Sequence, residues 1–162
     1  MKDEILEPKI DRLHYETVTR LIAAFDQKRE IVRYGPHSAT HQHISRARSA
    51  VLIFLPGLAE IENMHKCLDE FESNAKTTEK NYWYILPLHS RVTGEEQSRV
   101  FQPMSSLPPH LSHYRKIILS TNIAESSLTV PDITYVIDFC LVKQLVADPD
   151  TNFCCLKVII SK

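Results

Sequence analysis

The sequence predicts an α/β domain whose mainly parallel sheet carries helices on both faces. Short runs of β-branched and apolar residues alternate with segments of helical spacing, as in repeated strand–helix–strand units. The strand-like runs are nearly continuous in apolar residues, which is typical of strands covered on both faces. Near the end of the chain, two further strand-like runs flank a turn-rich centre, which predicts an antiparallel hairpin.

The expected elements follow in chain order. A helix is expected over 15–33, where Val18, Leu21, Ile22 and Phe25 share one face. After it we expect strand 51–55, helix 58–71, strand 83–88, helix 94–104, strand 116–120 and strand 135–140. The hairpin strands are expected at 142–146 and 156–160, around turn residues 148–152. The polar segment 34–45 contains Gly35-Pro36 and is expected to be a flexible loop.

Composition places the chain among ordinary globular domains. The 162 residues are one domain's worth of chain, with 43% apolar and 24% charged residues. No apolar run approaches the roughly 20 residues of a membrane span, and the amino terminus lacks the form of a signal peptide, so we expect an intracellular protein and no membrane partner. The net charge of −1 means that any nucleic-acid contact must come from a local arrangement of donors and cations.

The cysteines and histidines do not predict a metal site. The four cysteines show no CxxC spacing and are expected to be reduced and mostly buried. His37, His41 and His43 lie close together in the polar segment, but they have no carboxylate or cysteine partner nearby in the sequence. We therefore expect these histidines to lie in a solvated loop.

The most informative segment joins strands 116–120 and 135–140. It reads STNIAESSLT over 120–129 and is rich in small hydroxyl and amide side chains. It follows the carboxyl end of a strand, where open α/β sheets place their ligand crevices, and such side chains suit phosphate and sugar binding. For any single residue, capping a short helix or forming a turn remains the alternative.

Four segments resemble DEAH-box helicases of superfamily 2, in the order of that family. Residues 120–129 resemble motif V, 50–62 motif IV and 86–101 motif IVa, while 142–162 resemble a strand pair ending in Ile-Ser-Lys. The resemblance implies the second of two RecA-like domains, a three-layer α/β/α sandwich with a mainly parallel sheet and a C-terminal antiparallel hairpin. On this reading residues 1–162 form a single domain that stops just before motif VI.

The resemblance also implies roles for individual residues. Those matched to contacts with the backbone of single-stranded RNA are Thr121, Asn122, Ser127 and Thr129 in motif V, with Ser90 and Arg91 in the loop of motif IVa. Ser127 matches a serine proposed to sense the nucleotide state. Phe101 matches an aromatic residue that stacks on adenine. The alternatives are an ordinary exposed cation for Arg91 and a core helix residue for Phe101.

Three positions depart from the common DEAH-box pattern. Pro131 stands where an aspartate often contacts the ribose, so either Asp132 takes over with altered geometry or nucleotide contact is reduced. Cys140 stands where glycine is frequent, and Pro56 stands where threonine is common. These variants resemble the branch that contains RNA helicase A and the tudor-domain-containing germline helicases of the spindle-E type.

The chain lacks the parts that hydrolysis requires. It has no GxxxxGK[ST] phosphate loop and no Asp-Glu-x-His, so no catalytic residue is expected and the chain alone should not hydrolyse ATP. The resemblance implies a parent that is an ATP-dependent RNA helicase using ATP and Mg, with single-stranded RNA and the first RecA-like domain as partners. It further implies a cytoplasmic or germ-granule location and a role in the germline piRNA pathway.

The sequence leaves two other interpretations. One is an RNA-binding or protein-interaction module on the same fold, in a parent that has lost hydrolysis. The other is a flavodoxin-like or different α/β domain, which the absence of a glycine-rich first turn disfavours.

Overall fold

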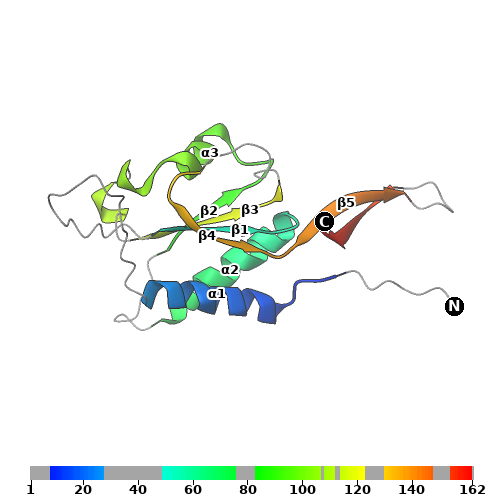
Figure 1. Ribbon diagram of the computed structural model, residues 1–162, viewed down its shortest axis with the longest axis horizontal. Coiled ribbons are helices and arrows are strands. Elements are labelled where there is room, and N and C mark those ends of the chain that lie inside the picture. Colours follow the sequence, from blue (N-terminus) through cyan, green and yellow to red (C-terminus); the bar gives the residue numbers. More distant parts are fainter. Residues whose placement is uncertain are drawn as a thin grey trace, which may run out of the picture.

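A four-stranded, all-parallel sheet lies between two layers of helices (Figure 1). The computed structural model describes residues 8–27, 49–75, 83–106, 108–111, 114–122, 130–147 and 154–161. The strands of the sheet are β1 (Ala50–Phe54), β2 (Trp83–Leu88), β3 (Arg115–Ser120) and β4 (Ile133–Asp138), in the order β2-β3-β1-β4. This arrangement confirms the predicted three-layer α/β fold.

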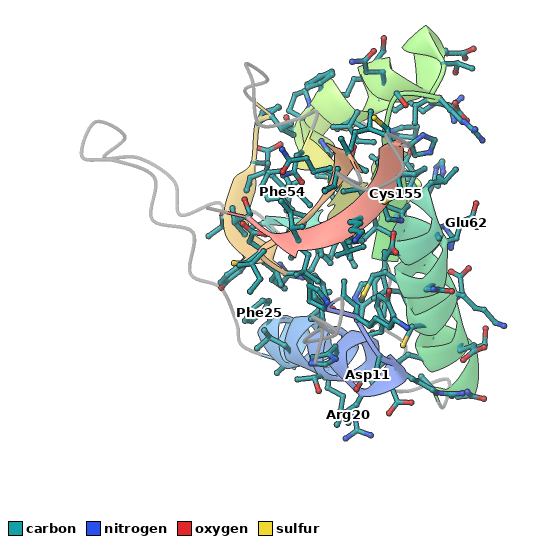
Figure 2. All side chains as sticks on the ribbon, turned by 90° about the vertical axis from the view of Figure 1, so that its right-hand side faces the viewer. Asp11, Arg20, Phe25, Phe54, Glu62 and Cys155 are labelled. Carbon is teal, nitrogen blue, oxygen red and sulfur yellow. The ribbon has the colours of Figure 1, made fainter. Side chains whose placement is uncertain are left out.

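The helices lie on both faces of the sheet, as predicted. α1 (Arg12–Gln27) and α2 (Leu58–Asn74) cover one face, and α3 (Gly94–Phe101) covers the other (Figure 1). Arg20 and Glu62 point away from the sheet into solvent (Figure 2). α1 begins at Arg12 rather than at 15, and its expected end at 33 lies outside the described residues. α3 ends at Phe101 rather than at 104, because the chain turns there into a 3-10 helix, Met104–Ser106. The expected loop 34–45 also lies outside the described residues.

Two apolar cores fill the spaces between the layers. The larger core lies between the sheet and α1–α2, and its members with no exposed surface are Ile22, Val51, Ile53, Leu55, Met64, Leu68, Ile117 and Leu119. The smaller core lies under α3 and contains Leu52, Leu86, Leu88, Val100 and Ile118. β3 has neighbours on both edges and helices on both faces, and all six of its residues are buried. This confirms the sequence interpretation of that strand.

The interpretation was wrong for β4, which was also expected to be covered on both faces. β4 is the outermost strand beside β1, and its residues alternate between partly buried and exposed. Tyr135 and Ile137 pack against the larger core, whereas Val136 on the opposite face is 58% exposed. The apolar composition of a strand does not tell whether it lies at the centre or at the edge of a sheet.

A buried ion pair fastens α1 to the sheet. Asp26 and Arg115 are almost fully buried, and Arg115 Nε donates to Asp26 Oδ1 at 2.6 Å. The indole Nε1 of Trp83 donates to Asp26 Oδ2 at 2.7 Å, and Arg115 also donates to the carbonyl oxygen of Ser49 at 2.6 Å. Buried charges are tolerated only when they are paired and hydrogen-bonded, and this pair meets both conditions.

The hairpin forms a separate two-stranded sheet, as predicted. β5 (Leu141–Ala147) pairs antiparallel with β6 (Cys154–Ile160), and the expected turn 148–152 lies outside the described residues. The hairpin extends beyond the carboxyl ends of the parallel strands (Figure 1). Its connection to β4 is closed by a hydrogen bond from Ser161 N to the carbonyl oxygen of Cys140, at 2.8 Å.

The cysteines differ from expectation in their burial. All four are free, but Cys140, Cys154 and Cys155 are exposed and Cys67 is only half-buried. Two of them fall on the hairpin, which is solvated, and one falls on the turn before it. Within the described ranges no group of side chains forms a metal site, and the histidines 37, 41 and 43 lie outside those ranges. The described helices include none that is long and apolar enough to cross a membrane.

Candidate nucleic-acid interface

A cleft of about 370 Å³ opens where the carboxyl ends of β1, β2 and β3 meet the hairpin. It is lined by Pro56, Gly57, Leu58, His89, Ser90, Arg91, Thr121, Asn122, Val142 and Lys143. The cleft thus brings together four of the residues singled out from the sequence: Thr121 and Asn122 after β3, and Ser90 and Arg91 after β2. Ser127 and Thr129 lie outside the described residues.

Backbone hydrogen bonds hold the two predicted loops beside each other. Thr121 N donates to the carbonyl oxygen of Leu88 at 3.2 Å, which ties the end of β3 to the end of β2. The loop after β2 then turns, with Val92 N bonded to the carbonyl oxygen of His89 at 3.1 Å and Arg91 N bonded to His89 Nδ1 at 3.2 Å. Ser90 and Arg91 therefore sit on a short, internally bonded turn.

A capping box fixes the other end of this turn. Thr93 caps α3: its hydroxyl accepts from Glu96 N at 3.3 Å, and its own N–H donates to Glu96 Oε2 at 3.0 Å. Hydrogen bonding to Thr93 lowers the pKa of the Glu96 carboxyl group, which keeps it ionised near the positive end of the helix dipole. The loop that carries Arg91 is consequently anchored at both ends.

The hydroxyl of Thr121 lacks a hydrogen-bond partner within the described part of the chain. Its Oγ1 is buried and makes no such bond, although most buried polar atoms do. A threonine hydroxyl can donate or accept as it rotates. A ligand atom that reaches this position would satisfy it.

The amino terminus of α2 forms another wall of the cleft. Gly57 is its N-cap residue and supplies no side-chain hydrogen bond to the first turn. The free N–H groups and the dipole of a helix start favour an anion, although Glu60 in the same turn opposes this. A Cβ atom on Gly57 would lie 2.6 Å from Lys143 Nζ, so a larger residue here would displace the flexible end of that side chain.

Lys143 is a residue of the cleft that sequence reasoning missed. It lies on β5 and forms a partly buried ion pair with Glu60, with Nζ and Oε2 2.7 Å apart. The sequence predicted the hairpin but contained no sign that it would face the carboxyl edge of the sheet. The cleft therefore has two cationic side chains, Arg91 and Lys143, although the whole chain carries a net charge of −1.

The residues predicted to contact the nucleotide lie elsewhere. Asp132 precedes β4, at the amino-terminal edge of the sheet, where its carbonyl oxygen accepts from Ala50 N at 2.7 Å. Its carboxylate accepts from Met104 N at 2.9 Å. Phe101 is the last residue of α3 and is half-buried. The structure thus separates Phe101 and Asp132 from the cleft and engages the Asp132 carboxylate within the domain.

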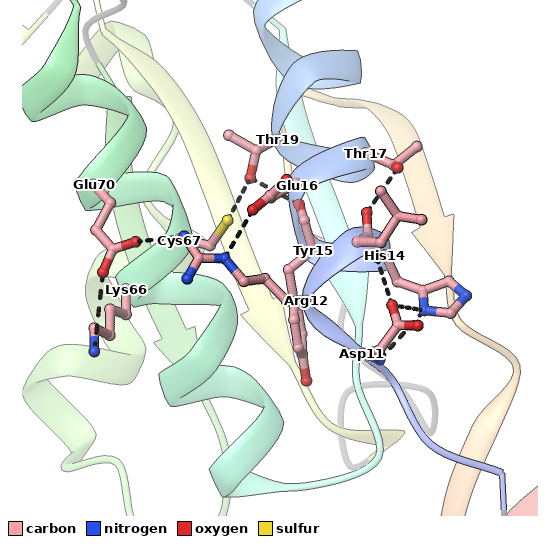
Figure 3. A network of polar contacts seen from close by, with 11 residues as sticks. Asp11, Arg12, His14, Tyr15, Glu16, Thr17, Thr19, Lys66, Cys67 and Glu70 are labelled. Carbon is pink, nitrogen blue, oxygen red and sulfur yellow. Dashed lines mark hydrogen bonds and ion pairs between the residues drawn. The ribbon is translucent and has the colours of Figure 1, made fainter.

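A second hollow, of about 220 Å³, lies between α1 and α2. Its charged side chains neutralise one another, as Figure 3 shows: Arg12 pairs with Glu16 at 2.8 Å and approaches Glu70 at 3.8 Å. The hydroxyl of Thr19 lies 3.5 Å from the sulfur of Cys67. These contacts join the two helices, so we read this hollow as part of the helix–helix packing.

The fold and the cleft together define a RecA-like helicase domain. The model of the helicase conserved C-terminal domain family matches residues 37–151, and the chain belongs to this family. It is a second RecA-like helicase domain, as the motifs indicated.

The relatives identify the branch. The chain is 46% identical over 152 residues to the ATP-dependent RNA helicase TDRD9 of Danio rerio, covering 94% of this chain and 10% of the relative. It is 39% identical over 157 residues to the probable ATP-dependent RNA helicase spindle-E of Drosophila persimilis, covering 97% and 10%. The spindle-E-type assignment is thereby confirmed. The chain spans about a tenth of the length of these relatives.

A solved structure supports the fold alone. The chain superposes on the E. coli DExH-box NTPase HrpB with a TM-score of 0.64 and 23% identity, covering 96% of this chain and 15% of that chain.

Proposed function

We propose that this domain grips the backbone of single-stranded RNA within an ATP-dependent RNA helicase and couples that grip to ATP hydrolysis at the cleft between two RecA-like domains. The observation that carries the proposal is the convergence of Thr121, Asn122, Ser90 and Arg91, from two strand ends, on one cleft. Lys143 adds a second cation from the hairpin. The names of the TDRD9 and spindle-E relatives, which describe RNA helicases, support this assignment.

The chemistry of the cleft suits a sugar–phosphate backbone. Arg91 and Lys143 supply charge for phosphates, while hydroxyl and amide groups supply neutral donors and acceptors for phosphates and sugars. Contacts of this kind position a strand without reading its sequence. Ser127 and Thr129 extend the same interface in this proposal, with Ser127 sensing the nucleotide state.

Nucleotide contact is assigned to a different part of the domain. We place the adenine against Phe101, and ATP with Mg between this domain and the first RecA-like domain of the parent. Pro131 offers no ribose hydrogen bond, and the carboxylate of Asp132 already binds Met104 N. The contribution to ribose binding is therefore expected to be small. A cytoplasmic or germ-granule location and a germline piRNA role are part of this proposal.

The RNA grip is tested by the salt dependence of binding in the full-length parent protein. Each lost phosphate contact on a single strand should reduce the slope of log K against log [salt] by about 0.7. We expect Arg91→Ala and Lys143→Ala each to reduce the slope by roughly this amount, measured by fluorescence anisotropy with a labelled oligonucleotide. Lys66→Ala is the matched control, because Lys66 is an exposed cation on α2 outside the cleft.

The slopes of the two cleft variants decide whether the RNA binds in the cleft. Unchanged slopes in both cleft variants would place the RNA elsewhere. A further variant, Glu60→Gln, removes the anion that competes for Lys143 and should strengthen binding.

Coupling is tested separately, by the ATPase of the same protein. Thr121→Ala and Ser127→Ala should reduce the stimulation of hydrolysis by RNA while leaving the fold intact. If both variants keep full stimulation, motif V has no part in the coupling. If the parent shows no ATPase at all, the domain serves as an RNA-binding module instead.

A further inference from the structure

Lys116 is a fully buried lysine at the start of β3 that caps α3. Its Nζ donates to the carbonyl oxygen of Val100 and, at 2.9 Å, to that of Gln102. The last carbonyl groups of a helix lack partners within the helix, and they carry the negative end of its dipole. A lysine ammonium group donates hydrogen bonds to these carbonyl groups and places a positive charge at the negative end of the dipole.

Asp132 holds the chain that follows α3 at Met104. Its carboxylate accepts from Met104 N at 2.9 Å, and its carbonyl oxygen accepts from Ala50 N at 2.7 Å, so it links this segment to β1. Positions 100, 102 and 104 are therefore each held from the sheet, two by Lys116 and one by Asp132. We call these three attachments the α3 clamp.

Phe101 lies between the two carbonyl groups that Lys116 binds. Its side chain is half-buried, and neither core cluster of the described residues includes it. Core packing therefore does not determine where the ring points. The backbone on either side is held at residues 100 and 102, and it fixes the direction of the Cα–Cβ bond from which the ring extends.

The nature of the capping residue supports a role in orientation. Desolvation lowers the pKa of the Lys116 ammonium group, and the charge of Asp132 opposes this effect. Burying a charge is costly, and an apolar side chain of similar volume often gives equal or greater stability. Apolar contacts are not directional, whereas Lys116 fixes two chosen carbonyl groups.

We propose that Lys116 is a positioning residue for the nucleotide: by holding residues 100 and 102, it directs the ring of Phe101 toward the adenine. The inference rests on the proposed contact between Phe101 and the base. It adds a residue that touches no ligand and acts only through the end of α3.

The test measures nucleotide affinity in the full-length parent protein. Two probes are compared: a non-hydrolysable ATP analogue, and tripolyphosphate, which has no base. Phe101→Ala should weaken binding of the ATP analogue by about two- to tenfold, the usual value of an aromatic contact, and leave tripolyphosphate unchanged. Lys116→Met removes only the ammonium group and should show the same selective loss.

The double variant Phe101→Ala/Lys116→Met shows whether Lys116 acts through Phe101 or independently of it. If Lys116 acts through Phe101, the double variant should bind the ATP analogue no more weakly than Phe101→Ala alone. Additive losses, or a Lys116→Met protein with normal affinity, would overturn the positioning role. A loss of affinity for both probes would show a merely structural effect and would also overturn it.

The experiment distinguishes failure of the proposed adenine contact from failure of the Lys116→Met variant to fold. If Phe101→Ala itself binds the ATP analogue normally, the proposed adenine contact fails, and the positioning role fails with it. If Lys116→Met does not fold, Lys116→Gln retains amide donors and should give an intermediate, base-selective loss. Normal affinity of a folded Lys116→Gln protein for the ATP analogue would then count against the role.

Discussion

Replacing Asp26 by asparagine should remove a large part of the stability of this domain. Asp26 accepts hydrogen bonds from Arg115 Nε at Oδ1 and from Trp83 Nε1 at Oδ2. Both partners are donors, so the amide group of asparagine necessarily turns its NH2 toward one of them. The substitution also removes the carboxylate charge that pairs with the buried guanidinium of Arg115.

The expected magnitude follows from the burial of the pair. The side chains of Arg115 and Asp26 are 1% and 2% exposed, so water cannot replace the lost partner. Breaking a buried pair by removing one member costs about 3–5 kcal/mol. The free energy of unfolding of a small protein falls by about 2 kcal/mol per M of urea, the middle of the usual range, so the midpoint should fall by roughly 1.5–2.5 M.

The assay uses the chain's single tryptophan. Trp83 bonds to Asp26 and stacks on Phe71 with ring centroids 5.6 Å apart, so its fluorescence reports directly on this region. Urea denaturation of the 162-residue chain should be followed by fluorescence and by circular dichroism. Glu16→Gln is the control, because it removes only a solvated ion pair on α1 and should leave the midpoint unchanged.

A loss below about 1 kcal/mol would refute the reasoning, because it would mean that the Arg115 charge finds water or another partner at little cost. The double variant Asp26→Leu/Arg115→Met gives the complementary result. Removing both charges should recover most of the stability lost by Asp26→Asn.

Three further predictions concern single positions. Cys140→Gly should raise the free energy of unfolding by about 1 kcal/mol in the same urea assay, because Cys140 has φ 55° and a side chain is strained in that region; equal stability would contradict this. Lys116→Met should abolish a gain in stability that the unsubstituted chain shows at alkaline pH. The pKa of Lys116 is lowered in the folded state, so as pH approaches 10.5 the unfolded chain binds more protons than the folded chain. The free energy of unfolding of the unsubstituted chain should therefore rise with pH there, relative to that of the variant. Gly57→Ala should leave the fold intact, because φ is −173°, but should displace Lys143 Nζ and weaken RNA binding in the full-length protein; RNA affinity equal to that of the unsubstituted protein would contradict it.

Local sequence was sufficient to predict the centre of the sheet and four of the ten residues that line the cleft. The apolar run of β3 is buried as predicted, since a central parallel strand needs apolar residues on both faces. Parallel strands place their carboxyl ends at one edge, so residues after β2 and β3 had to meet there. The convergence of Ser90, Arg91, Thr121 and Asn122 follows from that geometry.

Partners distant in sequence were beyond prediction. Asp26 and Arg115 are 89 positions apart, and neither residue differs locally from a solvated charge. No local pattern marks Lys116 as buried, yet it is fully buried because α3 ends directly beside it. Lys143 enters the cleft only because of how the hairpin packs, which no local pattern encodes. The positive φ of Cys140 is a backbone conformation that glycine adopts without strain.

β3 connects the two proposed ligand contacts. Lys116 at its start holds the end of α3, and Thr121 directly after it lines the cleft. The strand pairs with β2 on one edge and β1 on the other along its length, and it is fully buried, so bending it would break backbone hydrogen bonds and core packing together. A signal between nucleotide and RNA is therefore not expected to travel by a local distortion of this strand. Rigid movement of the whole domain against the proposed first RecA-like domain meets no such cost, and it would move the α3 clamp and the cleft as one body.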